Sequence, residues 1–205
     1  MKANTGSLNL APGVAEVISH SFTTSPVTAY FLRTPTSTWS PDDIPYALIH
    51  EHLKDEIPAK VRLGAKVAEA GDYAAAALWF PPECSVHDEP GTTSDVIREY
   101  VGKVEDARGR WLRGRPFWYL NLIGRRPGRD EKGVVRALID PFLELARKDG
   151  VPAWLEAASE HSRGVYAHFG FRVVEEFRVG VGVCDRRGDL VDGGEGVPLW
   201  GMIYE

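Results

Sequence analysis

Residues 117–183 alternate between apolar stretches of two different periods, and this alternation constrains the fold most strongly. The apolar run FWYLNLIG at 117–124 is typical of a buried strand. A helical repeat follows over 134–150, then a short strand at 151–158, a compact helix at 159–170 and an alternating strand at 171–183. Strands separated by helices in this order predict an α/β fold, with a sheet of mixed direction and helices on its faces.

The N-terminal part predicts further helices around this unit. Apolar residues at helical spacing indicate helices at 14–22 and 26–32. A third helix is expected at 44–64, where Pro58 should interrupt or bend it. The residues expected to share one face of this helix are Ile44, Leu48, His52 and Ile57.

Turn and cap signals divide the rest of the chain. Gly71 and Asp72 lie between two short apolar runs and predict a β-hairpin with a two-residue turn. Ser94 or Asp95 should cap a helix over 96–111, and the last strand is expected at 198–205. In the helix at 134–150, which Pro141 should bend, the expected apolar stripe is Val134, Leu138, Phe142 and Leu145.

Composition and charge narrow the class of protein. A chain of 205 residues with 43% hydrophobic residues fits one domain over 1–205. The net charge of -5 disfavours binding to nucleic acid or to an anionic membrane. Cys84 and Cys184 lack partners at disulfide-framework or zinc-site spacing, so we expect reduced thiols and no metal site. Without a signal-peptide pattern or an apolar run of about 18 residues, a cytoplasmic protein is expected.

A basic segment separates the strand at 117–124 from the following helix. Positions 125–136 carry five cations and two anions, a local net charge of +3. A helix N-terminus offers unpaired backbone amides and a positive dipole end, which together favour an anion such as a phosphate group. The basic segment therefore has two interpretations: a phosphate-binding loop, or a solvated charged connection between the strand and the helix.

Four landmarks in this region resemble the GCN5-related N-acetyltransferase (GNAT) family. They are the strand WYLNLIG, Lys132-Gly133 at the start of a long helix, the strand AWLEAAS at 153–159, and SRGVYAHFGFRVVEE at 162–176. In the last of these, Tyr166 is followed four and five residues later by Gly170 and Phe171. The resemblance implies a GNAT-like fold: a central, mostly antiparallel sheet with splayed middle strands and helices on both faces.

The resemblance also implies acetyl-CoA as co-substrate, with its pyrophosphate held by the loop before the helix. The family's loop pattern begins with Gln or Arg, keeps a central Gly and ends in Gly or Ala. This chain keeps Gly133, but Asp130, Glu131 and Val135 stand where the family pattern has other residues. If the alignment is shifted by one residue, Arg129 occupies the leading position. The implied cofactor-binding residues are Leu122, Ile123, Arg125, Arg129, Lys132, Gly133, Val134, Val135 and Ser159.

Other implied contacts concern the pantetheine arm of the cofactor. In the family the strand splays from its neighbour and its backbone pairs with pantetheine, which here corresponds to residues 120–123. Ser159 stands where many members have an Asn that contacts the same arm, and its side chain is shorter.

Two residues are candidates for catalysis by direct transfer from acetyl-CoA to an amine. Tyr166 matches the tyrosine that protonates the leaving thiolate, and with an ordinary pKa near 10 it is protonated at neutral pH; the alternative is a buried structural tyrosine. Glu156 is the candidate general base, although it could equally cap the next helix or pair with Arg163. Second choices are His161, which could instead face the core, Glu160, and the loop residues His87 and Asp88.

The expected acceptor is a small-molecule amine. Aromatic residues for its site could come from the N-terminal helices, the 81–94 loop and the C-terminal hairpin, although scattered aromatics are more often part of the core. The candidates are Tyr30, Trp39, Trp79, Phe80 and Trp200. The alternative function is a GNAT-fold protein with a degenerate cofactor loop that serves as a binding module or catalyses an acetyl-CoA-independent reaction. A homodimer is left open.

Overall fold

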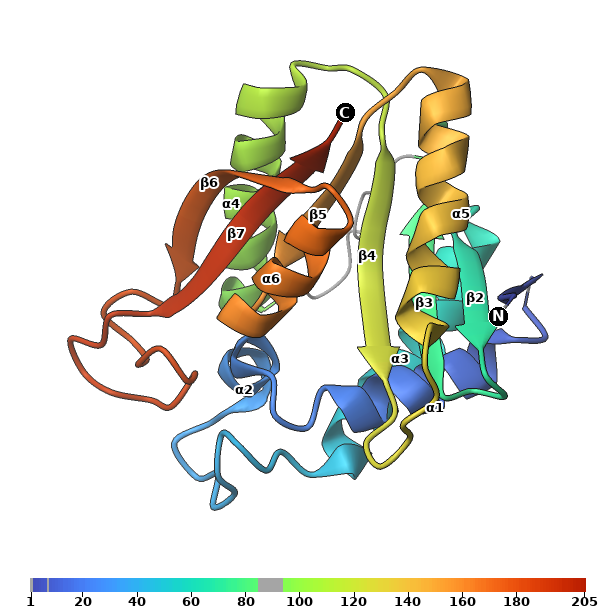
Figure 1. The fold of residues 1–205 in the computed structure, drawn as a ribbon. Helices are drawn as coiled ribbons and strands as arrows, with labels where there is room; N and C mark the ends of the chain where they lie inside the picture. Colours follow the sequence, from blue (N-terminus) through green and yellow to red (C-terminus); the bar gives the residue numbers. More distant parts are fainter. Residues whose placement is uncertain (1, 7, 85–93) are drawn as a thin grey trace.

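A seven-stranded sheet with strand order β1-β2-β3-β4-β5-β7-β6 forms the centre of the computed structural model (Figure 1). The structure describes residues 2–6, 8–84 and 94–205. Its strands are β1 (Asn4–Gly6), β2 (Lys66–Ala70), β3 (Ala75–Phe80), β4 (Trp118–Arg125), β5 (Ala153–Ala157), β6 (Arg172–Val179) and β7 (Val197–Tyr204). Its helices are α1 (Ala11–Ser21), α2 (Pro26–Leu32), α3 (Tyr46–Arg62), α4 (Asp95–Leu112), α5 (Val134–Asp149) and α6 (Glu160–His168).

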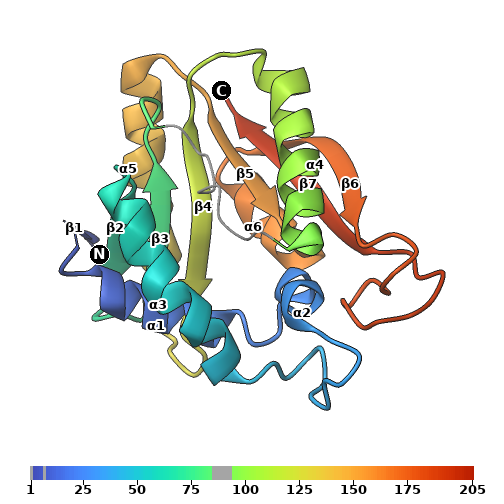
Figure 2. The ribbon, with the colours of Figure 1, turned by 180° about the vertical axis from the view of Figure 1, so that it is seen from behind.

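All neighbouring strands pair antiparallel except β4 and β5, which are parallel. Helices cover both faces: α5 and α6 lie in front of the sheet in Figure 1, and α1, α3 and α4 lie in front of it when the molecule is turned (Figure 2). Each face has its own hydrophobic cluster, with Trp154 and Ile18 on the α1 side and Trp79 and Leu138 on the α5 side. The predicted α/β fold with a mixed, mostly antiparallel sheet is confirmed.

The third helix differs from its prediction in two ways. Residues Ile49, Leu53 and Ile57 form its buried stripe, whereas Leu48 is 41% exposed, His52 is exposed and Ile44 is buried ahead of the helix. Pro58 lies inside α3 without interrupting it. The prediction was correct for Ile57 and wrong for Leu48 and His52, which lie one position before Ile49 and Leu53 of the face that packs toward α1.

Two smaller corrections concern the hairpin and α5. The β2–β3 hairpin is present, but four residues, 71–74, connect its strands rather than two, and Asp72 and Tyr73 adopt positive φ. In α5 the predicted Leu145 is 38% exposed and Ala146 is buried in its place. The short β1, which pairs with β2, was not predicted.

Candidate active site

The two middle strands separate soon after they begin, and this opening organises the candidate site. β4 pairs with β5 only through Trp118 with Ala153 and Tyr119 with Trp154. β4 then continues to Arg125, and beyond Tyr119 its edge toward β5 has no strand partner in the described part of the chain. Figure 1 shows the strands diverging toward the end where α5 and α6 begin. The expected splay of the middle strands is therefore present.

A β-bulge lies at the point where the strands part. Leu78 pairs with Leu122 and Trp79 with Leu120, so Asn121 is the extra residue of β4. The Asn121 side chain donates to the Tyr119 hydroxyl over 3.1 Å and accepts from Lys60 Nζ over 2.9 Å. A bulge disrupts the regular ladder and turns one residue away from it. This bulge was not predicted from the sequence.

Glu156 lies across the opening from the bulge and is held by several donors. Its Oε2 accepts from the Tyr119 hydroxyl over 2.8 Å, while Oε1 accepts from Trp154 Nε1 over 2.5 Å and from Arg108 over 3.2 Å. The Glu156 side chain is 4% exposed and that of Arg108 is 11% exposed. A buried ion pair persists only with such extra hydrogen bonds, because desolvation of both charges is costly. Glu156 therefore neither caps the next helix nor pairs with Arg163. The Arg163 guanidinium instead lies 4.9 Å from the centre of the Trp200 ring.

Arg108 and Tyr119 also belong to this candidate site, although the sequence did not point to them. The Arg108 guanidinium lies 3.9 Å from the centre of the Tyr119 ring, a cation–π distance. Burial raises the pKa of the Tyr119 hydroxyl, and the positive charge of Arg108 offsets this only in part. One signal could have found Arg108: it follows Val104 by four residues on the buried side of α4, where an arginine needs a partner.

Tyr166 lies on α6 with a free hydroxyl. Its ring packs against the hydrophobic cluster on the α5 side and meets Phe171 edge-on at 6.3 Å. Among the described residues the hydroxyl has no hydrogen-bond partner, so it can donate to a ligand. Burial raises the pKa of Tyr166, which keeps the phenol protonated at neutral pH.

The N-terminus of α5 has the features of an anion site. Gly133 precedes the helix with φ +80°, a conformation that favours glycine, and no atom lies within 4 Å of the position that a β-carbon would occupy there. No side chain caps the helix, so its first backbone amides are available, and Lys132 and Arg125 are exposed nearby in the chain. Val134 is buried and the half-buried Val135 packs inward against the α5-side cluster. The residues present fit a diphosphate group at this end.

Arg129 and Glu131 are less suited to a diphosphate site. Arg129 donates to Glu131 over 2.6 Å and to the Gly71 carbonyl over 2.9 Å, which ties the loop to the β2–β3 turn. The hydrogen bond from Arg129 lowers the pKa of Glu131. The other oxygen of Glu131, Oε2, is buried without a hydrogen-bond partner among the described residues. Arg129 is thus already engaged within the protein.

The remaining predicted cofactor contacts lie along the opening. Leu122 and Ile123 are half-buried and pack against the clusters on opposite faces of the sheet. Ser159 caps α6: its hydroxyl accepts from the Ser162 backbone, and the Ser162 hydroxyl accepts from the Ser159 backbone. The Ser159 side chain therefore has a structural role of its own.

The second-choice residues do not gather at the opening. His161 is exposed rather than facing the core, and Glu160 forms an exposed ion pair with Arg186 at 3.8 Å. His87 and Asp88 lie outside the described residues. Most of the aromatic acceptor candidates are core residues: Trp79, Phe80, Trp200 and Tyr30 are buried, and Trp39 is half-buried against Arg33.

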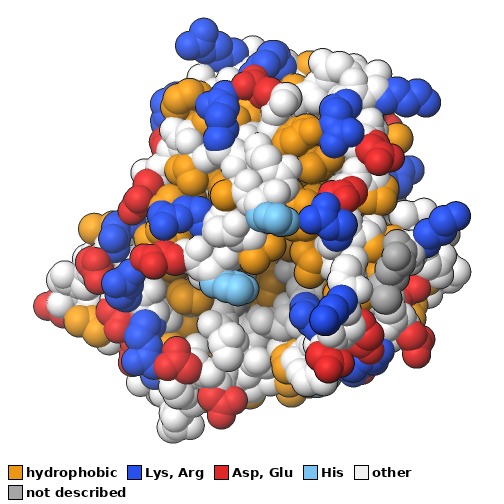
Figure 3. Space-filling model, viewed as in Figure 1, with side chains coloured by type: hydrophobic (Ala, Val, Ile, Leu, Met, Phe, Trp, Pro, Cys, Tyr) orange, Lys and Arg blue, Asp and Glu red, His pale blue; other side chains and the backbone are white. Residues whose placement is uncertain are grey.

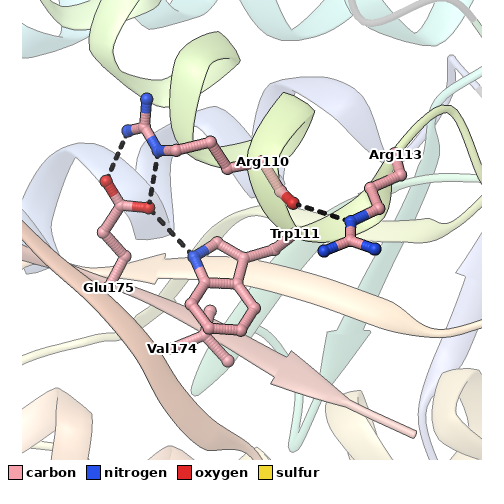
Figure 4. Close-up of a pocket in the computed structure, with 5 residues that line it drawn as sticks. All are labelled: Arg110, Trp111, Arg113, Val174 and Glu175. Atoms are coloured by element: carbon pink, nitrogen blue, oxygen red, sulfur yellow. Dashed lines mark hydrogen bonds and ion pairs between the residues drawn. The ribbon is translucent and has the colours of Figure 1, made fainter.

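A pocket of about 440 Å³ lies elsewhere, between the end of α4 and β6 (Figure 4). Arg110 and Trp111 both donate to Glu175 there, so the polar groups of the pocket satisfy one another. β6 is the second strand beyond β5, which separates this pocket from the opening. By contrast, hydrophobic side chains are visible between charged ones on the face that carries α5 and α6 (Figure 3).

Three further findings concern the described part of the chain. Cys84 and Cys184 are free thiols. Within residues 2–6, 8–84 and 94–205, no group of three or more His, Cys, Asp or Glu side chains is arranged to hold a metal ion. None of the helices in these ranges is long and apolar enough to cross a membrane.

No protein-family model matches the chain. It is 36% identical over 92 residues to a Saccharomyces cerevisiae protein whose name refers to increased recombination centers, which covers 44% of this chain and 59% of that protein. It is 28% identical over 123 residues to an uncharacterized N-acetyltransferase of Schizosaccharomyces pombe, covering 51% of this chain and 50% of that protein. It is also 34% identical over 116 residues to mycothiol acetyltransferase of Propionibacterium freudenreichii, and this match covers 54% of this chain and 35% of that protein. The chain thus spans about half the length of curated relatives that it matches.

Solved structures resemble the whole chain. The C-terminal condensation domain of Ebony, in complex with beta-alanyl-dopamine, matches with TM-score 0.67 and 14% identity over 100% of this chain and 98% of that one. An agmatine N-acetyltransferase mutant in apo form matches with TM-score 0.64 and 15% identity over 100% of this chain and 99% of that one. A mosquito arylalkylamine N-acetyltransferase-like protein matches with TM-score 0.62 and 12% identity over 98% of each chain. The chain has the fold of these solved acetyltransferases, and two of its sequence relatives are named as acetyltransferases.

Proposed function

We propose that the protein is an acetyl-CoA-dependent N-acetyltransferase that acetylates a small-molecule amine by direct transfer. The observation that carries this proposal is the opening between β4 and β5, with the uncapped N-terminus of α5 at the same end of the sheet. The unpaired edge of β4 over residues 120–123 would bind the amide groups of pantetheine as an added strand does. The first amides of α5, with Gly133, Lys132 and Arg125, would bind the diphosphate.

Direct transfer requires three events in this opening. The amine nitrogen bonds to the thioester carbon, the carbon–sulfur bond breaks, and one proton passes from the amine while another reaches the departing sulfur. The bulge at Asn121 would present a backbone N–H to the carbonyl oxygen, where negative charge develops. Tyr166, whose hydroxyl has no hydrogen-bond partner among the described residues, would protonate the sulfur.

Glu156 is the proposed acceptor of the amine proton. Tyr119, Trp154 and Arg108 already occupy its two oxygens, so the proton would reach it through a water molecule or through the Tyr119 hydroxyl. These donors fix the carboxylate in one orientation, which is the geometric condition for a catalytic group.

One observation favours the second candidate function, a GNAT-fold binding module without acetyl-CoA chemistry. Glu131 places a carboxylate in the loop and pairs with Arg129, one of the cations that the loop could otherwise offer to a phosphate. Whether the loop still binds the cofactor separates the two functions.

Titration calorimetry with CoA and with acetyl-CoA at low salt tests the proposal. We expect a dissociation constant between about 1 μM and 1 mM, the usual range for an enzyme and its substrate. Release of free CoA thiol from acetyl-CoA is then measured with a panel of amines. Absence of heat and of a thermal shift at millimolar CoA would exclude the transferase and favour the binding module.

A further inference from the structure

Aromatic side chains line the α4 side of the sheet next to the opening. Tyr100, Val104 and Arg108 follow one another at intervals of four residues on α4, so they share one face of the helix. Arg108 reaches Glu156 at the opening. Tyr100 lies two turns earlier on α4. Tyr100 and Ala158, the residue directly beyond the end of β5, both pack against one hydrophobic cluster. This shared cluster connects the Tyr100 ring to the end of β5.

A second ring meets Tyr100 from α2. The Phe31 and Tyr100 rings are 5.2 Å apart at an interplanar angle of 80°, an edge-to-face contact. Both side chains are half-buried, which leaves part of each ring accessible. The neighbouring Tyr30 donates to Glu99 of α4 over 2.7 Å, so α2 and α4 are fastened together where the rings meet. The rings are thus positioned before any ligand arrives.

Four carboxylates on this side of the sheet form ion pairs. Glu156 pairs with Arg108, Glu99 with Lys103, Glu56 with Lys60, and Glu16 with Arg126. Each of these four carboxylates has its own cation, so together they offer no net negative charge to a polycationic amine. The aromatic surface is what remains to select an acceptor.

We propose that the acceptor is an arylalkylamine, a primary amine on a short alkyl chain attached to an aromatic ring, and that Phe31 and Tyr100 bind this ring. The inference rests on the proposed transferase function and names its substrate class. The structural neighbours include proteins named for agmatine and for arylalkylamines, so the fold alone does not choose between them. The choice rests on the two rings and on the paired carboxylates.

The test compares 2-phenylethylamine with agmatine. We expect the wild-type kcat/KM to be at least about tenfold higher for 2-phenylethylamine, since contact with two rings contributes roughly that factor. Phe31→Leu and Tyr100→Leu should each lower this ratio about three- to tenfold with little change in CoA affinity. Trp111→Leu, which alters an exposed aromatic at the other end of α4, is the matched control and should leave the ratio unchanged.

The outcomes separate this inference from the function on which it rests. If CoA binds and agmatine is acetylated as well as 2-phenylethylamine, the aromatic acceptor is wrong while the transferase stands. If CoA does not bind, the transferase is wrong, and saturation-transfer NMR on 2-phenylethylamine alone then decides the binding surface. A signal that is lost in Phe31→Leu and kept in Trp111→Leu supports the surface, and no signal in the wild type overturns it. Melting temperatures show which variants remain folded.

Discussion

At the scale of single residues, the candidate site depends on how a few buried polar groups are satisfied. Glu156 is almost fully buried yet has a partner for each oxygen, whereas the hydroxyl of Tyr166 has no partner among the described residues. A hydroxyl that no described residue engages can still form a hydrogen bond with a ligand. The two residues therefore contribute differently: Glu156 within a fixed network, and Tyr166 as a free donor.

Tyr166→Phe tests the free donor. The change keeps the ring and removes the hydroxyl, so the acetyl-transfer rate should fall by roughly 10² to 10⁴-fold while CoA affinity and melting temperature stay nearly constant. Because burial raises the pKa of Tyr166, the wild-type kcat should show no alkaline loss from this group up to about pH 9. A mutant rate within about threefold of wild type, measured by thiol release, would show that Tyr166 only packs.

Arg108→Met tests the fixed network. The variant leaves Glu156 buried without its cation, which should lower the free energy of unfolding by about 3–5 kcal/mol. Adding Glu156→Gln removes the uncompensated charge and should restore a large part of that loss, in a urea-unfolding comparison of the single and double variants. Equal stability of Arg108→Met and wild type would mean that the ion pair contributes nothing net.

At the scale of elements, the loop at 125–133 connects β4 to α5 and combines two opposing features. The N-terminus of α5 is uncapped and open, but Glu131 adds a negative charge and holds Arg129 against the β2–β3 turn. Coulomb attraction between a phosphate and the helix end is weakened by a carboxylate this close in the chain. The loop is thus a phosphate site whose strength Glu131 limits.

Glu131→Gln should strengthen CoA binding about three- to tenfold, because it removes one like charge and releases Arg129. The gain should shrink as salt is raised, since these charges are exposed to screening. Glu144→Gln removes the same charge from an exposed position farther along α5 and serves as the control in calorimetry. Equal or weaker binding by a folded Glu131→Gln would show that the Arg129–Glu131 pair itself shapes the loop for the cofactor.

At the scale of the whole molecule, two hydrophobic clusters hold the helices to the sheet and keep the opening in place. β3 is buried along its whole length between α1 and α5, which explains how a strand rich in alanine forms despite the weak strand propensity of that residue. Trp79 of this strand donates to the Leu138 carbonyl over 3.2 Å and stacks on Phe142 at 4.9 Å. This contact joins the sheet to α5, the helix of the anion site.

Trp79→Ala should lower the free energy of unfolding by about 3–5 kcal/mol, because it leaves a large cavity and removes the hydrogen bond to the Leu138 carbonyl. Trp111→Ala, at a 40% exposed position, should cost much less, about 1 kcal/mol or below. Thermal and urea unfolding of both variants measure the difference. If both variants lose similar free energies of unfolding, the main stabilising contacts lie outside the β3–α5 interface.

The sequence by itself determined the order and type of the elements and several of their ends. Ser94 caps α4 as predicted, and Tyr166 lies on the short helix where its motif placed it. These features depend on neighbours a few residues away, so periodicity and cap chemistry reveal them. The fold class followed from that order and from the resemblance to the GNAT family.

Only the tertiary structure decided how the site is assembled. Arg108 and Glu156 meet across 48 positions of sequence, and the extra residue Asn121 becomes visible only when β4 is paired with β3. The buried stripe of α3 likewise depends on what packs against it rather than on its own period. Local patterns carry no information about such long-range partners, because the free energy that fixes them arises from burial and charge pairing between distant segments.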